Sequence, residues 1–547
     1  MLALRFGRTI LCTCKRLSEP TCTHSVTYQL MSTTPTEPVV IRIPKPMLDR
    51  VEKNRQTRQR TISKVPVIKA GRLLIKSKNP QLNQSVGFTL GRFEETRLCS
   101  KGWKHRKSFG DYFTINSTQT APPFITECEQ RGTDTSKSAT FNKFRIHQAL
   151  VETLRRENII HPTTVQIEVI PKLLRGHNVL CAAETGSGKT LTYLLPIIHD
   201  LQSRKEIQND TNTHALVLVP SRELANQVLT VSRMLGKEFN LNVKVLGGGR
   251  GVGNIKAAFT HGEPDIVVST PGALLKAMQR NYVNLNKLRF LVIDEADTMF
   301  DPSFSGMLER ILQNMHVASA VSETRGLFPK AQMVLVGATF PEGVGEVLSN
   351  VTDLGSVLTI KSQRLHHLMP HVKQTFVKVK GADKLLELNH ALKKVEQDGV
   401  GVLVFCNSAS TVNWLGFALE DLGVRHVRLQ GAMPASMREG IFQNFQKGLV
   451  NVLVCTDIAS RGLDTHRVKL IVNYDFPESH TDYIHRAGRV GRAGGQADGE
   501  VLSFVTHKWD VELVQKIEIA ARRRTCLPGL ESEIHQPTPK AADDQNK

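Results

Sequence analysis

The chain has 547 residues, enough for two or three domains at roughly 150 residues each. Hydrophobic residues make up 40% of it and the mean hydropathy is −0.20, with no window near the roughly 20 apolar residues of a membrane span, so we expect no membrane insertion. The net charge of +20 is uneven, because residues 1–110 hold 22 Lys or Arg against 6 Asp or Glu, a net +16. Such a basic block can be a solvated tail, a targeting signal or an arm that binds a polyanion, most commonly nucleic acid.

The first 30 residues have the composition of a mitochondrial transit peptide. They hold one acidic residue, Glu19, among many Ser, Thr and Leu, and four basic residues, Arg5, Arg8, Lys15 and Arg16. A secretory signal would instead have one unbroken apolar core. We therefore expect residues 1–30 to direct the chain to the mitochondrial matrix, with a nuclear or cytosolic pool left open. A basic tail without a targeting role is the alternative.

Residues 31–140 are expected to form a basic extension followed by a linker. Aromatic side chains are interleaved with basic clusters, at Phe93, Trp103 and Phe109 and at residues 53–60 and 101–107. Bases of a single-stranded nucleic acid could stack on these aromatics while the phosphates meet the cations. The alternative is an extension that packs its aromatics on the protein core. Residues 114–140 are rich in Ser, Thr, Pro and Gln, which is typical of a linker.

Beyond Phe141, apolar runs alternate with segments of helical periodicity, which is typical of repeated βαβ units. Two series of strands are expected, ending at Ala182, Val219, Ser269, Ile293 and Val336 and at Phe405, Leu429, Val454, Asn473 and Val505. The pattern predicts an α/β fold with two tandem parallel-sheet domains, residues 141–363 and 364–524. A polar tail follows at residues 525–547.

A phosphate-binding loop follows the first expected strand. Residues 182–190 read AAETGSGKT and precede an expected helix. Glycines let backbone N–H groups close around phosphate oxygens at a helix N-terminus, while Lys189 can reach the outer phosphates and the Thr190 hydroxyl can ligate Mg²⁺. The loop therefore predicts nucleotide binding by Ala183, Glu184, Thr185, Gly186, Ser187, Gly188, Lys189 and Thr190.

Residues 290–297 read FLVIDEAD, an apolar run that leads directly into acidic residues. The run suits a strand covered on both faces, and parallel sheets bind ligands at the carboxyl ends of their strands. Alone, the acids could form a solvated turn. Beside a phosphate-binding loop, Asp294 is the expected holder of Mg²⁺ and Glu295 the expected base or positioner of the attacking water.

The second domain offers cations for the far side of the γ-phosphate. Residues 485–492 read HRAGRVGR, and Arg489 and Arg492 would face the same way on a helix. We expect them to act as arginine fingers. A basic, solvated helix face is the alternative for this segment taken alone.

The order of these motifs over residues 141–520 resembles the DEAD-box RNA helicases of superfamily two, which have two RecA-like domains. Residues 162–166, PTTVQ, together with Phe141, are similar to the adenine-binding motif of that family. The resemblance implies that Gln166 pairs with the adenine edge, that Phe141 packs on the ring, and that Thr163 lies at the same site. Asn158 stands where the family usually has glycine.

The same resemblance assigns residues that face RNA and residues that link RNA to ATP. The implied RNA-binding residues are Pro220, Arg222, Gly247, Gly248, Thr270, Pro271, Gly272, Asn407, Arg438 and Thr456. Asp464 matches a position that touches the nucleotide. The implied coupling residues are Asp297, Ala338, Thr339 and His485.

The resemblance implies an enzyme that hydrolyses ATP to ADP and phosphate with Mg²⁺, closes its two domains on RNA, and locally unwinds short duplexes. The alternative is an ATP-gated clamp or assembly scaffold that holds RNA without significant unwinding. The basic extension and import-like start are similar to mitochondrial members of the family. That similarity implies mitochondrial ribosomal RNA and assembly intermediates of the mitochondrial large ribosomal subunit as partners of a monomeric protein.

Overall fold

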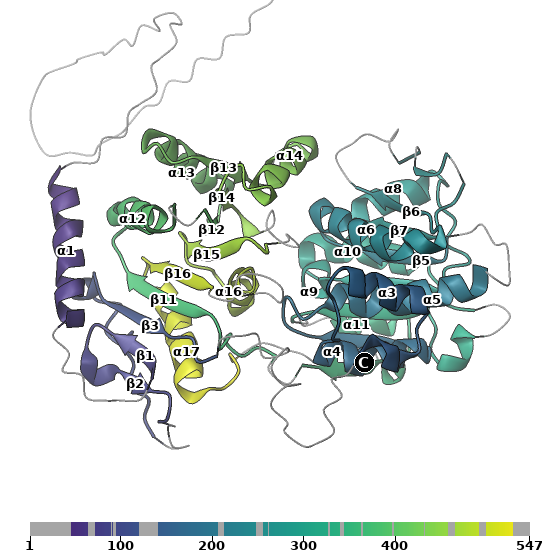
Figure 1. The fold of residues 1–547 in the computed structure, drawn as a ribbon, viewed down its shortest axis with the longest axis horizontal. Coiled ribbons are helices and arrows are strands. Elements are labelled where there is room, and N and C mark those ends of the chain that lie inside the picture. The colour runs from purple at the N-terminus through teal and green to yellow at the C-terminus, as the bar shows by residue number, and fades with distance from the viewer. Residues whose placement is uncertain are drawn as a thin grey trace, which may run out of the picture. The chain divides into compact units, whose positions relative to one another are not determined.

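The computed structural model describes most of the chain between residues 45 and 528 (Figure 1). The described residues are 45–63, 72–88, 90, 94–119, 140–205, 213–247, 255–256, 258–260, 262–325, 329–339, 344–362, 365–396, 399–431, 433–457, 465–491 and 499–528. The expected transit peptide lies outside these ranges, as does most of the expected polar tail. Within them, no helix is both long enough and apolar enough to cross a lipid bilayer.

The first sheet consists of strands that run parallel throughout its described residues. Its strand order is β10-β4-β9-β8-β5-β7-β6. The strands are β4 (Val179–Ala182), β5 (Ala215–Leu218), β6 (Val243–Leu246), β7 (Ile266–Ser269), β8 (Phe290–Asp294), β9 (Gln332–Gly337) and β10 (Leu358–Lys361). Every residue of the central strands β4, β9, β8, β5 and β7 is buried, as expected for a sheet with both faces covered.

Helices cover the two faces of this sheet. They are α3 (Gln148–Arg156), α4 (Thr164–Leu174), α5 (Lys189–Lys205), α6 (Arg222–Gly236), α8 (Pro271–Gln279), α9 (Ala296–Met299), α10 (Pro302–Leu312) and α11 (Val344–Ser349). Alternate residues of one strand join different cores: Val179 packs in the cluster with α3 to α6, and Leu180 in the cluster with α8 to α11. The period of two in a strand therefore builds both layers.

The second sheet has the described strand order β13-β14-β12-β15-β16-β11-β3-β1-β2. Its parallel part consists of β11 (Lys373–Lys378), β12 (Gly401–Phe405), β13 (His426–Leu429), β14 (Val452–Cys455), β15 (Val468–Asn473) and β16 (Glu500–Val505). The helices are α12 (Lys384–Glu396), α13 (Ala409–Asp421), α14 (Ala435–Gln446), α16 (His480–Ala487) and α17 (Asp510–Arg523). All ten strand ends expected from the sequence are confirmed to within one residue.

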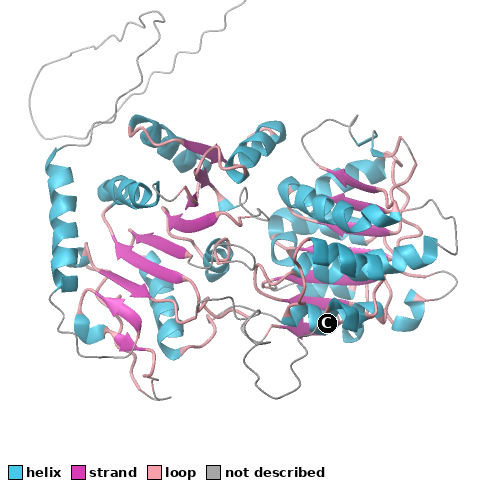
Figure 2. Cartoon of the chain, in the orientation of Figure 1, coloured by secondary structure: helices cyan, strands magenta, loops and turns pink. Residues whose placement is uncertain are grey.

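The extension before the first domain contributes the last three strands of the second sheet. They are β1 (Leu73–Ser77), β2 (Gln84–Ser85) and β3 (Tyr112–Ile115). Strand β3 pairs antiparallel with β11, and β1 pairs antiparallel with β3. The linker was expected to begin at residue 114, but residues 114 and 115 are the last two residues of β3. The sequence did not indicate this strand, because its partner β11 lies more than 250 positions further along the chain. Figure 2 shows these strands alongside β11.

Aromatic packing and a buried carboxylate attach the extension to the second domain. Trp103 is 1% exposed, and the Phe113 ring stacks on Phe376 of β11 with a centroid distance of 4.8 Å. The carboxylate of Glu518, on α17, accepts hydrogen bonds from the Cys99 and Ser100 backbone N–H groups at 2.8 and 3.1 Å. The aromatic side chains of the extension were expected either to bind nucleic acid or to pack on the protein core, and Trp103 packs on the core. Phe93 lies outside the described residues.

Helix α1 (Lys45–Ser63) contains the first basic cluster. Its Arg50 forms an ion pair with Asp383, and its Val51 is buried. The side chains of residues 55–60 are outside the described part of the structure. The nucleic-acid-binding alternative for this cluster stays a prediction.

Candidate active site

The phosphate-binding loop joins β4 to α5, which begins at Lys189. Gly186 and Gly188 have φ of +82° and +84°, in the left-handed region that favours glycine. A Cβ at Gly188 would lie 2.5 Å from the Nε2 atom of Gln166, so the loop needs glycine there for space as well as for conformation. The Lys189 Nζ donates to the Ala183 carbonyl at 2.9 Å and thus lies against the loop.

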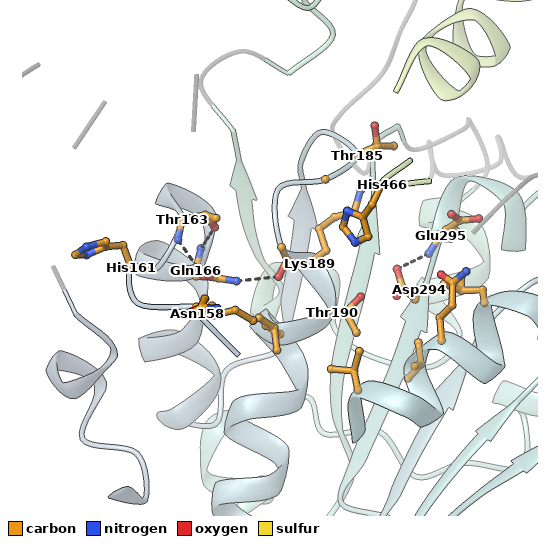
Figure 3. A pocket seen from close by; sticks show the side chains of 18 of the residues that line it. Asn158, His161, Thr163, Gln166, Thr185, Lys189, Thr190, Asp294, Glu295 and His466 are labelled. Atoms are coloured by element: carbon orange, nitrogen blue, oxygen red, sulfur yellow. Dashed lines mark hydrogen bonds between the residues drawn. The ribbon is translucent and has the colours of Figure 1, made fainter. Parts of the chain in front are cut away.

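Helix α4 braces this loop from the side. Thr163 caps the helix, and its hydroxyl donates to the Ser187 carbonyl at 2.8 Å. The Gln166 amide accepts from the Thr163 N–H at 2.9 Å and donates to the Gly188 carbonyl at 3.1 Å. Gln166, implied to read adenine, and Thr163, implied to lie at the same site, therefore also hold the phosphate loop; Figure 3 shows the bond from Gln166.

Asp294 ends β8 as a fully buried carboxylate. One oxygen accepts from the Tyr193 hydroxyl at 2.9 Å and the other from the Glu295 N–H at 2.9 Å. Burial, reinforced by the negative charge of Glu295, raises the pKa of Asp294 to about 6. Glu295 has φ of +50°, the left-handed region, so the chain turns sharply right after the strand.

The donor set at Asp294 suits Mg²⁺. A desolvated carboxylate that resists ionisation gains from a nearby dication, and the Thr190 hydroxyl lines the same cavity. Among the described residues there is no group of three or more His, Cys, Asp or Glu side chains that could hold a metal. Mg²⁺ needs only a few protein ligands where waters and phosphates complete its coordination shell.

Asp297 lies on α9, three residues after Asp294. Its carboxylate contacts the His485 Nε2 at 2.8 Å and accepts from the Thr339 hydroxyl at 3.3 Å. Burial would raise the pKa of Asp297, but the neighbouring His485 outweighs it and holds that pKa well below its usual range. The predicted coupling residues Asp297, Thr339 and His485 are therefore joined through one carboxylate, next to Ala338.

The expectation that Arg489 lies on a helix is wrong, because α16 ends at Ala487; Arg489 follows it in a turn and is 2% exposed, which also excludes a solvated helix face. Its Nη2 lies 3.6 Å from the Glu295 Oε1, so the first domain's acid faces a cation from the second domain. The other predicted finger, Arg492, and the predicted nucleotide contact Asp464 lie outside the described residues.

A cavity of about 630 Å³ connects these groups. Its lining includes seven residues that the sequence had assigned to ATP, Thr163, Gln166, Thr185, Gly186, Gly188, Lys189 and Thr190, together with Asp294, Glu295 and Arg489. Asn158 lines the cavity too, with φ of +59°, a conformation that asparagine tolerates where the family usually has glycine. Phe141 lies elsewhere, 1% exposed in the core and edge-on to Phe144.

The predicted RNA residues of the first domain follow the carboxyl ends of three neighbouring strands. Pro220 and Arg222 follow β5, Gly247 follows β6, and Thr270 caps α8 after β7. The Arg222 side chain packs over Gly247, where a Cβ would come within 2.9 Å of the Arg222 Cδ. These groups share one edge of the sheet because its strands are parallel. Pro271 and Gly272 open α8 beside them, and Gly248 is outside the described residues.

In the second domain, a buried arginine that sequence reasoning missed organises the predicted residues. Arg486 is 1% exposed and makes a bidentate contact with Asp457, at 2.7 and 2.6 Å. It also donates to the Asn407 Oδ1 at 2.6 Å. Asn407 is thus bonded to the helix that precedes Arg489. Only folding brings these residues together, although the motif HRAGRVGR contained the arginine.

Two other predicted RNA residues and two missed residues complete the site. Thr456 follows β14, and Arg438 on α14 has its Nε 3.6 Å from the Glu223 Oε1 of α6. Tyr193 binds Asp294, and His466 lines the cavity. Neither Tyr193 nor His466 had a local sequence signal, since each is a single residue in an otherwise ordinary segment.

Comparison with known families identifies the class of protein. A family model described as "DEAD/DEAH box helicase" matches residues 163–347, and one described as "Helicase conserved C-terminal domain" matches residues 383–494. Together they cover more than half of the chain. The chain belongs to the DEAD-box RNA helicase family and is an ATP-dependent RNA helicase that binds ATP and RNA.

Individual relatives cover nearly the whole chain. The "Probable ATP-dependent RNA helicase DDX28" of Mus musculus is 50% identical over 513 residues, which span 92% of this chain and 94% of the relative. The human protein of the same name is 49% identical over 520 residues, spanning 93% and 95%. Similarity to these relatives therefore includes the N-terminal extension as well as the two domains.

Solved structures show the same two-domain fold. "S. cerevisiae Dbp5 bound to RNA and ADP BeF3" matches with a TM-score of 0.60 and 25% identity, covering 70% of this chain and 94% of that one. "Structure of Mss116p (NTE and C-tail double deletion) bound to ssRNA and AMP-PNP" also has a TM-score of 0.60, at 23% identity, over 71% and 79%. The predicted pair of RecA-like, parallel-sheet domains is confirmed.

Proposed function

We propose that this helicase opens short RNA duplexes by an ATP cycle in which the cavity between Lys189, Glu295 and Arg489 is the hydrolytic site. The observation that carries the proposal is the 3.6 Å approach of Arg489 to Glu295, which brings a cation of the second domain to the acidic motif of the first. Residues 141–363 and 364–524 act as the two lobes of the enzyme. Arg492 is the second finger and Asp464 a further nucleotide contact.

The residues divide the chemistry among them. The loop N–H groups and Lys189 hold the phosphates, Thr190 and Asp294 would hold Mg²⁺, and Glu295 orients the water that attacks the γ-phosphorus. When bound, Mg²⁺ would neutralise negative charge on the triphosphate. Arg489 stabilises the charge that develops on the departing phosphoryl group. Hydrolysis then weakens the contact between the domains and releases RNA.

RNA is gripped mainly through phosphates and 2′-hydroxyls, so sequence preference is low. Arg222, Thr270, Arg438 and Thr456 supply the contacts, with Asn407 oriented by Arg486. Asp297 reports RNA binding to the ATP site through His485 and Thr339, a connection supported by the 2.8 Å contact to His485. We expect the affinity for RNA to fall steeply as salt rises.

Mitochondrial ribosomal RNA is the proposed substrate, within assembly intermediates of the large ribosomal subunit in the matrix. The acid-poor, Arg-containing segment 1–30 and the concentration of positive charge in the first 110 residues support this proposal. The protein works as a monomer. A nuclear or cytosolic pool is compatible with inefficient import.

Two substitutions test the hydrolytic site. Lys189→Ala should abolish RNA-stimulated ATP turnover, and Glu295→Gln should retain ATP and RNA binding while hydrolysis stalls. Turnover is measured with saturating RNA and binding by fluorescence anisotropy of a labelled strand. Normal turnover by Glu295→Gln would refute the role given to that carboxylate.

Strand release distinguishes unwinding from clamping. A helicase should release a labelled strand from a short duplex in proportion to ATP turnover, whereas a clamp would turn over ATP or hold RNA without release. Crosslinking in cells followed by sequencing of the bound RNA tests the substrate. Recovery of RNAs other than mitochondrial ribosomal RNA would contradict that assignment.

A further inference from the structure

The segment that connects the two domains, described at residue 362 and at residues 365–371, contains two buried histidines that the catalytic motifs do not include. His366 is 7% exposed and His371 is 4% exposed. Connecting segments normally lie at the surface with mobile polar side chains. The burial of two imidazoles in such a segment therefore needs a structural explanation.

Each imidazole contacts the backbone of a catalytic motif. The His366 Nε2 lies 2.9 Å from the Ala338 carbonyl oxygen, and the His371 Nε2 lies 2.8 Å from the Gly491 carbonyl oxygen. A carbonyl oxygen can only accept, so in both rings the proton is on Nε2. The Nδ1 of His371 is buried with no hydrogen-bond partner among the described residues, which fits a neutral ring with that tautomer. Burial lowers the pKa of both histidines.

The two carbonyls belong to segments to which we assigned the coupling to RNA and the contact with the γ-phosphate. Ala338 is next to Thr339, whose hydroxyl donates to Asp297. Gly491 is two residues beyond Arg489 and has φ of +70°. A Cβ at Gly491 would lie 2.6 Å from the His371 Nε2, so the glycine lets the ring approach this closely. Each histidine is thus fitted to the motif that it touches.

The segment is itself held in place by contacts before His366, at His366 and between the two histidines. The Ser362 hydroxyl donates to the Glu184 carboxylate of the phosphate-binding loop at 2.7 Å. The Pro370 carbonyl accepts from the Thr118 and Gln119 N–H groups, at 2.6 and 3.1 Å, where the N-terminal extension leaves the second sheet. The His366 backbone, at φ of +65°, has its carbonyl bonded to the Leu527 N–H at 2.9 Å. A non-glycine residue in that region is held there by its contacts.

We propose that His366 and His371 are positioning residues of the ATP cycle: they connect the interdomain segment to residues 338–339 in one domain and to Gly491 and the following Arg492 in the other. Any change in the path of the segment as the domains close then moves both motifs together. The histidines touch neither nucleotide nor RNA in this scheme. The inference rests on the proposed function for its kinetic consequence, whereas the positioning can be measured separately.

The test compares full-length His366→Leu and His371→Leu with His366→Gln and His371→Gln. A glutamine side chain has an amide N–H at about the reach of the imidazole Nε2, whereas leucine has no donor. The leucine variants should bind ATP and RNA within about twofold of the wild type, with the KM for ATP unchanged, and lose about tenfold in RNA-stimulated kcat, a usual size for coupling between sites. The glutamine variants should recover most of that loss.

His367→Leu is the matched control. It lies next to His366 and is half-buried, and among the residues that the structure describes its ring nitrogen bonds to the carbonyl of Leu365 in the same segment. Its kcat should stay at the wild-type value. A tenfold loss in this variant would show that any change in the segment slows the enzyme and would overturn the specific roles of His366 and His371.

Hydrogen exchange provides a readout that does not depend on turnover. The peptide that contains Ala338 should exchange faster in His366→Leu, and the peptide that contains Gly491 faster in His371→Leu. Wild-type exchange in both peptides would overturn the proposal. If a leucine variant does not fold, the asparagine variants, whose shorter amide cannot reach the carbonyl, are compared with the glutamine variants instead, and equal kcat in the two would also overturn it. A wild-type chain without RNA-stimulated turnover would refute the proposed function, and the exchange result would still decide the positioning.

Discussion

The two sheets of this helicase are built in different ways, although both contain a parallel core. The first takes its strands from one continuous stretch, residues 179–361, and its edges are the parallel strands β10 and β6. The second borrows three antiparallel strands from residues 73–115, which precede the first domain in the sequence. The first domain is therefore inserted between two parts of the second, so its chain is joined to the second sheet at both ends.

Because of this difference, the residues proposed for catalysis and the residues that stabilise the fold lie in different parts of the chain. The residues proposed to hold the phosphates, and the acids of residues 294–297, come from the first sheet, close to strand ends. The extension supplies a covered edge for β11 and a buried Trp103, which stabilise the second sheet that presents Arg489. The extension is therefore part of the folded second domain. This role does not depend on whether its positive charge also binds a polyanion.

Deletion of the extension should have the largest effect of the changes that test this difference between the two sheets. Removing residues 1–139 should leave the second domain unfolded or aggregated, because the deletion opens the β11 edge and removes the side chains that cover Phe376. Removing residues 1–71 deletes α1 but keeps β1 to β3, and should leave the domain folded. All three tryptophans, Trp103, Trp414 and Trp509, belong to the second sheet and its attachments, so their fluorescence during urea unfolding reports that domain.

Equal unfolding midpoints for the two deletions, both matching the full chain, would contradict this. The extension would then be a passive tail and the contrast between the sheets would disappear.

A single substitution gives the next largest effect. Trp103→Ala should reduce the free energy of unfolding of the second domain by about 3–5 kcal/mol, the usual range for removing a buried tryptophan. The side chain is 1% exposed and packs 5.5 Å from the Phe113 ring, centroid to centroid. Trp509→Ala is the control, since that residue is 73% exposed and should change stability by about 0.5 kcal/mol or less. Similar effects of the two would show that the extension is not packed as described.

The chemistry of the first sheet should depend on pH through Asp294. Its pKa is raised to about 6, so the carboxylate is ionised above that pH and becomes protonated as the pH falls through it. A protonated carboxyl loses its affinity for Mg²⁺, and single-turnover ATP hydrolysis should fall as the pH drops below about 6. More Mg²⁺ favours the ionised form and should move the fall to lower pH.

Rates are measured between pH 5 and 8 at constant ionic strength, with circular dichroism as the check on folding. A rate that stays flat to pH 5 at low Mg²⁺ would contradict the role of Asp294.

The smallest effect is a difference in thiol reactivity. Burial, together with the charge of Glu518, raises the pKa of Cys99 to about 12, so little thiolate is present near neutral pH. Cys526 is exposed. Iodoacetamide at pH 8 should label Cys526 well before Cys99, as followed by mass spectrometry of peptides. Labelling of Cys99 at the rate of Cys526 would show that the extension separates from the second domain in solution.

The sequence predicted best where a function needs neighbouring residues. The loop AAETGSGKT and the run FLVIDEAD each place several functional groups within a few positions, and fully buried parallel strands have continuous apolar runs. The ten expected strand ends were therefore found. Strands β1 to β3, β6, β10 and β11 were not among the expected strands, because they are short, as β2 is at two residues, or have polar residues within the apolar run.

Only the tertiary structure decided which distant residues meet. The bidentate contact of Arg486 with Asp457 and the burial of Trp103 depend on pairings across tens to hundreds of positions. So do the two interdomain histidines, each a single residue with no motif around it. Such contacts form through the packing of whole helices and strands against one another, so no local sequence pattern predicts them.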